Sequence, residues 1–156
     1  MQNFKNEIIM WKGNYIMNNY NNLEMSILSC ILLKPELMEQ VIFEDKHIVS
    51  KQRLWQFMKA FYNRYKTFDI QLMYSICKDK WQIVQNIIQL LEYEPSPSLF
   101  DTYQKQLIDL YNEGKENKIK IDKVYKLANE LYVRKITIEE FKKGINEVLE
   151  WKEKKC

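Results

Sequence analysis

The sequence has little glycine and little proline, with three residues of each among 156. Tight turns depend on these residue types, so a β-sandwich or barrel built from many hairpins is not expected. Gly13, Gly114 and Gly144 lie far apart, and none belongs to a GxxxxGKS/T or GxGxxG motif. The sequence therefore offers no glycine-rich loop to hold the phosphates of a nucleotide.

Cysteine and histidine are also sparse, with three cysteines and one histidine. Cys30, Cys77 and Cys156 are scattered and form no CxxC pair, so neither a zinc site nor a disulfide framework is predicted. No apolar run is long enough for a signal peptide or a membrane span. We therefore expect a cytoplasmic protein that uses no cofactor, no metal ion and no membrane.

The remaining composition is ordinary for a globular protein, with 46% hydrophobic and 29% charged residues. The net charge is only +3, and three of the 24 basic residues are arginine. Arginine is the preferred residue for paired hydrogen bonds to phosphate or guanine, so this composition does not favour reading of a nucleotide sequence. Composition and apolar spacing together predict an all-α fold.

Residues 1–21 are polar and rich in asparagine, and we interpret them as a flexible N-terminal arm. Residues 22–98 carry apolar side chains at helical spacing and predict a compact globule of five or six helices. Pro35 ends the first helix and opens the second, and Asp69 is placed to cap the fourth. Trp55 and Trp81 are expected in the core. Other side chains expected on buried helix faces are Leu23, Ile27, Ile31, Leu37, Met38, Val41, Ile42, Leu54, Met58, Leu72, Met73, Ile76, Val84, Ile87, Ile88 and Leu91.

Residues 99–156 predict a long helical hairpin. Apolar residues follow a spacing near seven from Leu107 to Tyr132, with an interruption at Lys115–Lys120, and resume at Ile138. Thr137 and Glu140 have the spacing of a capping box at the start of the second helix. Two amphipathic helices around a short turn form an αα-hairpin, and apolar surface beyond what the pair buries must face another partner.

Several short stretches of residues 22–107 share an order and separation with one known domain. The stretches are Leu23–Pro35, Glu44–Asp45, Leu54–Met58 with Phe61–Tyr62, Phe68–Ile70, and Pro95–Ser96 followed by Tyr103. Together they resemble the N-terminal domain of bacterial DnaB-type replicative helicases, and residues 108–151 resemble the helical hairpin that follows it. A similar bundle and hairpin occurs at the helicase-binding end of bacterial primases.

The sequence departs from this family at several points. Ser29 and Lys51 stand where the family usually has glycine and histidine, and a glycine expected near Tyr65 is absent. The chain contains no Walker A sequence and no motor domain, so we expect no helicase activity of its own. The resemblance implies contact with a replicative helicase, a primase or a helicase loader, and self-association through the hairpin.

The residues predict no catalytic site. Cys30 and Cys77 lie in apolar stripes, where burial makes a thiol inert. His47 is interpreted as a loop or helix-start residue. The adjacent carboxylates Glu44–Asp45 and Glu139–Glu140 are better explained as helix caps than as an acid–base pair, because adjacent residues on a helix point apart.

The first functional hypothesis is therefore a non-enzymatic adaptor or modulator of DNA replication, encoded by a phage or mobile element. Mimicry of the helicase N-terminal domain would let it occupy the surface on which helicase, primase or loader meet. Aromatic and aliphatic side chains on the second hairpin helix are the interface candidates, because such residues anchor protein contacts. They are Ile138, Phe141, Ile145, Val148 and Trp151.

The alternative hypothesis is a small DNA-binding replication or regulatory protein. A cluster of lysines lies near Tyr111 and Tyr125, and lysines with stacking rings can hold single-stranded DNA weakly. Acidic residues interleave with these lysines, which is also the pattern of a solvated helix face. The lysines are Lys115, Lys118, Lys120, Lys123 and Lys126.

Overall fold

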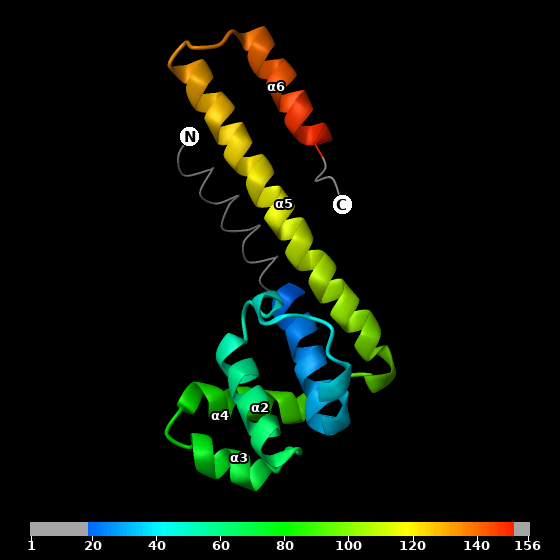
Figure 1. Ribbon diagram of the computed structural model, residues 1–156. Coiled ribbons are helices and arrows are strands. Elements are labelled where there is room, and N and C mark those ends of the chain that lie inside the picture. The colour runs from blue at the N-terminus through cyan, green and yellow to red at the C-terminus, as the bar shows by residue number, and fades with distance from the viewer. Residues whose placement is uncertain (1–18, 152–156) are drawn as a thin grey trace. The chain divides into compact units, whose positions relative to one another are not determined.

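The computed structural model describes residues 19–151, and this part of the chain is all-α with no β-strand, as the composition predicts (Figure 1). The chain divides into two compact units, and the division lies between Ile108 and Asp109. Within residues 19–151, no helix is both long enough and apolar enough to cross a membrane.

The first unit contains a series of short helices. Residues 19–33 are helical and are followed by the short 3-10 helices η1 (Pro35–Gln40) and η2 (Asp45–His47). Three α-helices come next, α2 (Gln52–Tyr65), α3 (Ile70–Cys77) and α4 (Trp81–Glu92). The 3-10 helix η3 (Pro97–Leu99) then leads into α5 (Phe100–Tyr132), which continues into the second unit.

Local signals in the sequence set the ends of these helices. Pro35 begins η1, since its fixed φ and missing N–H suit a first helical position. Asp69 caps α3 by accepting a hydrogen bond from the backbone N–H of Leu72 at 2.8 Å, which confirms the predicted cap. Helix α2 ends at Tyr65, and its C-cap residue Lys66 adopts φ 56° in the left-handed region that glycine usually fills.

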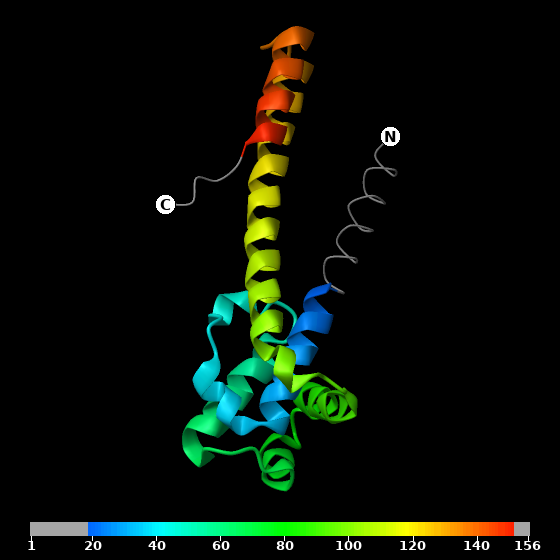
Figure 2. The same cartoon turned by 90° about the vertical axis from the view of Figure 1, so that its right-hand side faces the viewer.

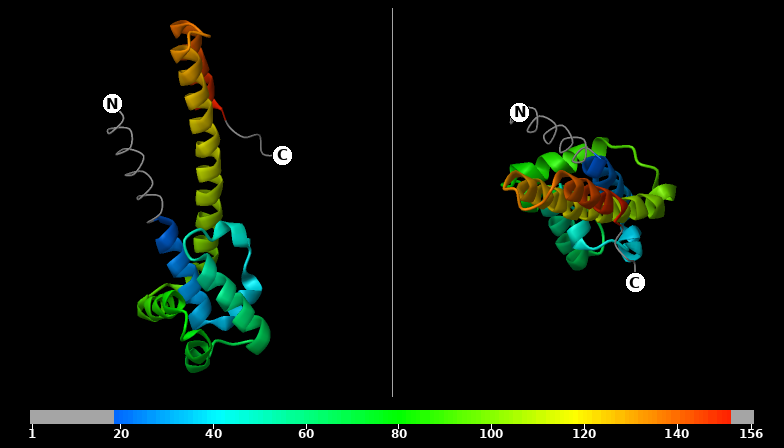
Figure 3. Two further views of the ribbon diagram at one scale, coloured as in Figure 1. Left: turned by 90° about the vertical axis from the view of Figure 1, so that its left-hand side faces the viewer. Right: turned by 90° about the horizontal axis from the view of Figure 1, so that it is seen from above.

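The core of the first unit lies between the helix of residues 19–33 and α2. Ile27, Ile31, Leu54 and Met58 are fully buried, and Trp55 is 2% exposed, as predicted. Figure 3 shows the first helix in blue beside α2. Burial of each large apolar side chain contributes about 1.5–3 kcal/mol, so these residues contribute substantially to the stability of the unit.

A buried carboxylate joins the same two helices. Glu24 is fully buried, and its oxygens accept hydrogen bonds from the backbone N–H groups of Ser50 (3.0 Å) and Lys51 (3.2 Å) and from the Ser50 hydroxyl. Lys51 is the N-cap of α2 and its own side chain makes no cap. Glu24 therefore satisfies donors at the start of α2 from a distant part of the chain.

A buried amide fixes the first turns of α5 to the first unit. Gln104 is fully buried; its Oε1 accepts from the Ile42 N–H at 2.7 Å and its Nε2 donates to the Gln40 carbonyl at 3.2 Å. Phe100 and Leu107 are buried beside it in sequence. The predicted boundary at residues 98–99 therefore separates the first turns of α5 from the globule in which their side chains are buried.

The predicted burial of α3 and α4 is partly wrong. Helix α4 buries Ile83, Val84, Ile87 and Leu90, whereas Trp81 is 66% exposed and Ile88 and Leu91 are also exposed. The apolar residues of α4 occupy about half of the circumference of the helix. Their spacing alone does not show which part of this apolar arc packs against the rest of the unit. In α3, Met73 and Cys77 are buried, Leu72 is half-buried and Ile76 is exposed.

Two further expectations change at the N-terminal side. Residues 1–18 of the predicted arm lie outside the described residues, but residues 19–21 are helical and Tyr20 is buried. The predicted second helix is the 3-10 helix η1, which buries only Leu37 and stops before Val41 and Ile42. Six residues are too few for the four-residue apolar face expected there.

The second unit is a helical hairpin. Helix α6 (Ile138–Glu150) follows the C-terminal part of α5. Helix α5 is continuous through residues 115–120, so the interruption in the apolar pattern does not break the helix.

Replacing Glu24 tests the buried carboxylate. Glu24→Ala leaves the Ser50 and Lys51 donors without an acceptor, and we expect the free energy of unfolding to fall by about 3 kcal/mol. Glu24→Gln keeps one acceptor oxygen and should have a smaller effect. Urea denaturation measures both, with the exposed Glu36→Ala as control. Equal stability of Glu24→Ala and Glu36→Ala would contradict this role.

Candidate functional site

The turn of the hairpin is closed by two local caps. At the end of α5, Arg134 has φ 58°, and the N–H groups of Arg134 and Lys135 donate to the carbonyls of Leu131 and Glu130. This is a Schellman motif without its usual glycine. At the start of α6, the predicted capping box of Thr137 with its N3 glutamate is confirmed, since each side chain accepts from the other's N–H.

Two contacts define how the helices of the hairpin pack. Gly144 faces Leu127 so closely that an added Cβ would lie 2.9 Å from a Leu127 methyl carbon. The Lys123 ammonium lies 4.3 Å from the centre of the Trp151 ring, a cation–π contact. The helices are therefore antiparallel, as Figures 1 and 2 show. The sequence did not indicate the role of Gly144.

The second unit buries very little. Val148 is the only buried residue between Asp109 and Trp151, and it is 7% exposed. A buried side chain in a normal core touches six or more other residues. The contact between α5 and α6 contains only one such side chain, so it contributes little stability. The apolar side chains of the hairpin therefore have substantial surface left for another partner.

Helical geometry shows where the exposed side chains of α6 lie. The Gly144–Leu127 contact marks the side of α6 that faces α5. Counting about 100° per residue, Ile138 and Leu149 lie roughly 120–140° round α6 from Gly144. Their side chains are 58% and 66% exposed.

The exposed side chains of α5 follow the same geometry. Ile121 and Tyr132 lie roughly 120–140° round α5 from Leu127, in the same sense. Because the helices are antiparallel, equal rotations carry both sets to one side of the hairpin. We call this set the hairpin face; it consists of Ile121, Tyr125, Tyr132, Ile138 and Leu149, all exposed.

The predicted interface residues are divided between this face and the contact within the hairpin. Ile138 is exposed on the hairpin face, and Ile145 is half-buried beside it. Phe141 is half-buried and Val148 is buried on the side towards α5, while Trp151 is half-buried against Lys123. Their heptad-like spacing could not separate the two sets, because one apolar arc of α6 serves both.

The predicted lysine cluster is not one free cationic face. Lys120 forms an ion pair with Glu116 at 3.6 Å, and Lys123 lies over Trp151. Lys115, Lys118 and Lys126 are exposed. By helical geometry Asp122 lies on the same side of α5 as these three lysines, which reduces the positive potential there.

The single histidine has a structural role. His47 is 6% exposed, and its Nδ1 accepts a hydrogen bond from the Glu44 N–H at 2.8 Å. Burial holds the pKa of His47 below its ordinary value, with the positive charge of Lys46 as a second cause. Glu44 is the N-cap of η2 and His47 its N3 residue, so they form a capping box.

The carboxylate of the neighbouring Asp45 also accepts hydrogen bonds from within the protein. It accepts hydrogen bonds from the Trp55 indole N–H at 2.8 Å, from the Gln56 amide and from the Lys59 ammonium. The hydrogen bond from Lys59, followed by that from Trp55, holds the pKa of Asp45 below its ordinary value. Asp45 therefore joins the loop before α2 to that helix.

The two described cysteines are buried. Burial raises the pKa of the Cys30 thiol to about 11 and raises that of the Cys77 thiol as well. Neither sulfur is a thiolate near neutral pH. Within residues 19–151, no group of three histidine, cysteine, aspartate or glutamate side chains is placed to hold a metal ion.

Comparison with known proteins adds no relative. No protein-family model matches the chain, and no curated protein and no solved structure matches it either.

The histidine leads to a prediction about pH. Because the folded pKa of His47 is lowered, the unfolded chain binds a proton first as the pH falls through about 6.5. The stabilisation is present above that pH and lost below it. We expect the free energy of unfolding to fall between pH 7 and pH 5, and to fall less in His47→Gln, whose amide oxygen can accept the same hydrogen bond. Identical pH profiles would contradict this interpretation.

The cysteines lead to a prediction about reactivity. In a Cys156→Ser variant, the remaining thiols should react with a disulfide reagent at pH 8 about a hundredfold more slowly than in urea. Absorbance of the released thiolate measures the rate. Rapid reaction of one thiol in the folded protein would indicate an activated cysteine.

Proposed function

We propose that this chain is a non-enzymatic adaptor of DNA replication that binds a replicative helicase, its primase or its loader through the hairpin face. The proposal rests on one observation, the excess of exposed over buried apolar side chains in the second unit. Within residues 109–151, the hairpin exposes five large apolar or aromatic side chains on one side and buries only Val148.

Such a face fits a protein partner. Exposed apolar patches with polar surroundings mark interaction surfaces, and tyrosine is enriched among the residues that dominate binding energy. Tyr132 is 86% exposed and lies beside the turn, and Tyr125 lies two turns earlier on α5. Charged residues such as Lys142 and Glu147 on α6 are exposed and supply a polar surround.

The class of partner rests on the sequence resemblance to the helicase N-terminal domain. That resemblance includes Pro35, which begins η1, Asp69, which caps α3, and the Pro95–Ser96 pair, which precedes η3. A chain of this kind would compete for or bridge contacts of the replication machinery by mass action. A second copy of the chain could cover the same face, which is the self-association that the resemblance implies.

Binding to DNA through Lys115–Lys126 is the weaker alternative. A groove for single-stranded DNA requires several free cations along the strand, as well as stacking rings. Two of the five predicted lysines are engaged within the hairpin, and Asp122 lies among the others.

The test uses one substitution on the hairpin face. Ile138→Asp places a carboxylate in an apolar contact, and we expect it to weaken binding to purified helicase, primase or loader about tenfold or more. The hairpin should remain folded, because Ile138 is exposed and an acidic residue suits the first turn of a helix. Surface plasmon resonance measures the affinity, and sedimentation measures self-association.

Lys143→Gln is the matched control, since it makes the same change of charge at an exposed position of α6 that lies roughly 120–140° round the helix from the hairpin face. Equal affinities of Ile138→Asp and wild type, or no binding to any of the three proteins, would rule out the proposal. Binding of DNA that is lost steeply with salt and with Lys115 and Lys126 replaced would support the alternative.

A further inference from the structure

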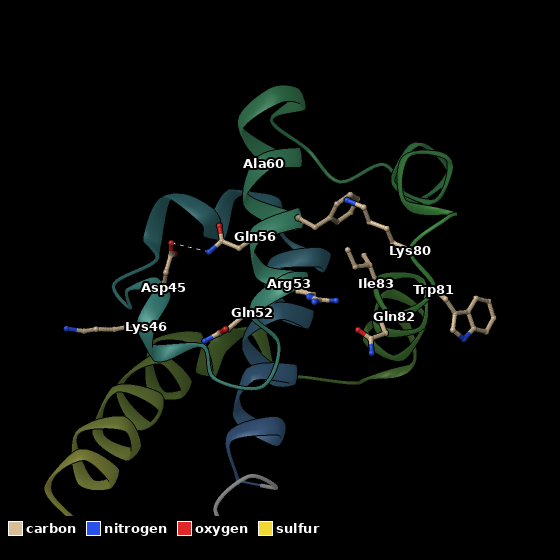
Figure 4. Close-up of a pocket in the computed structure, with 11 residues that line it drawn as sticks. Asp45, Lys46, Gln52, Arg53, Gln56, Ala60, Lys80, Trp81, Gln82 and Ile83 are labelled. Atoms are coloured by element: carbon tan, nitrogen blue, oxygen red, sulfur yellow. Dashed lines mark hydrogen bonds between the residues drawn. The ribbon is translucent and has the colours of Figure 1, made fainter. Parts of the chain in front are cut away.

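A groove lies on the surface of the first unit, between the outer side of α2 and the start of α4. Its volume is about 1210 Å³. Helix α2 contributes Arg53, Phe57 and Ala60, whose spacing of four and three residues places them on one face. The start of α4 contributes Lys80, Trp81 and Ile83 (Figure 4).

The groove carries unpaired positive charge. Arg53 and Lys80 are exposed, and neither forms an ion pair within residues 19–151. Figure 4 shows both side chains directed into the space between the helices. The one carboxylate of the lining, Asp45, lies away from Trp81 and is already paired with Lys59. The groove is therefore complementary to a negatively charged ligand.

The groove also has an apolar part. Ile83 is 5% exposed and forms part of the lining together with Ala60 and the half-buried Phe57. Trp81 lines the rim and points away from α2 in Figure 4. An exposed tryptophan beside a cationic groove is typical of residues that anchor a protein contact.

We infer that this groove binds an acidic peptide segment of a partner protein, with an apolar side chain among its carboxylates. Arg53 and Lys80 pair with the carboxylates, Phe57 and Ile83 cover the apolar side chain, and Trp81 adds contact area at the rim. This surface lies in the first unit and does not depend on the hairpin face, so it goes beyond the proposed function.

The observations favour a peptide over a nucleic acid. A strand of nucleic acid carries one phosphate per nucleotide and is held by cations that follow its backbone, together with rings on which bases stack. The groove offers two unpaired cations and a lining that includes aliphatic side chains. Three glutamines, Gln52, Gln56 and Gln82, also line it and can bond to the backbone of a peptide.

The experiment uses a fluorescein-labelled peptide of sequence DLDDFDEL and measures its anisotropy with the full chain. We expect binding that weakens with salt, and a loss of affinity of about tenfold in the double variant Arg53→Glu, Lys80→Glu. Trp81→Ala should weaken binding severalfold without a change of charge. The charge-reversed peptide KLKKFKKL should bind weakly or not at all.

Lys34→Glu is the charge-matched control for the single variant Arg53→Glu, because Lys34 is an exposed cation of the first unit outside the groove. Thermal unfolding followed by circular dichroism shows that each variant is folded. Ile138→Asp should bind the peptide like wild type, which separates this proposal from the hairpin face.

Three results would overturn the inference. One is the absence of peptide binding at millimolar concentrations. Another is an equal loss of affinity in Lys34→Glu and in Arg53→Glu. The third is binding of labelled oligothymidylate, tighter than that of the peptide and abolished by Arg53→Glu with Lys80→Glu, which would assign the groove to nucleic acid.

Discussion

The buried carboxylate of Glu24 is the constraint on which the first unit depends. A charged group with no exposed surface is tolerated only where hydrogen bonds replace its water, and here they come from Ser50 and Lys51 at the start of α2. Glu24 thereby sets the position of α2 against the first helix. One side of α2 then forms the core and the other side forms the groove, so both depend on this interaction.

The loop before α2 is held in a comparable way. Asp45 joins it to Trp55 and Lys59, and the Glu44–His47 capping box closes the short helix η2. Polar residues of this loop thus fix a segment with little regular structure. Their hydrogen bonds account for their positions in the loop.

The two units differ in how much of their own apolar surface they bury. In the described part of the chain, the first unit buries most of its large apolar side chains, whereas Val148 is the single buried residue of the hairpin. The two proposed surfaces also differ in chemistry. The hairpin face offers aromatic and aliphatic contacts, and the groove offers Arg53 and Lys80 beside Trp81.

The sequence by itself determined the helical class, the Asp69 cap, the capping box of α6 and the burial of Trp55 and the two cysteines. These follow from local spacing and from hydrogen bonds between residues close in sequence. The tertiary structure decided which part of each apolar arc is covered. Trp81 and Ile138 proved exposed, and Val148 buried, because helical periodicity gives the direction of an apolar face but not the position of its neighbour. The Glu24, Gln104 and Gly144 contacts join residues distant in sequence, so no local pattern could indicate them.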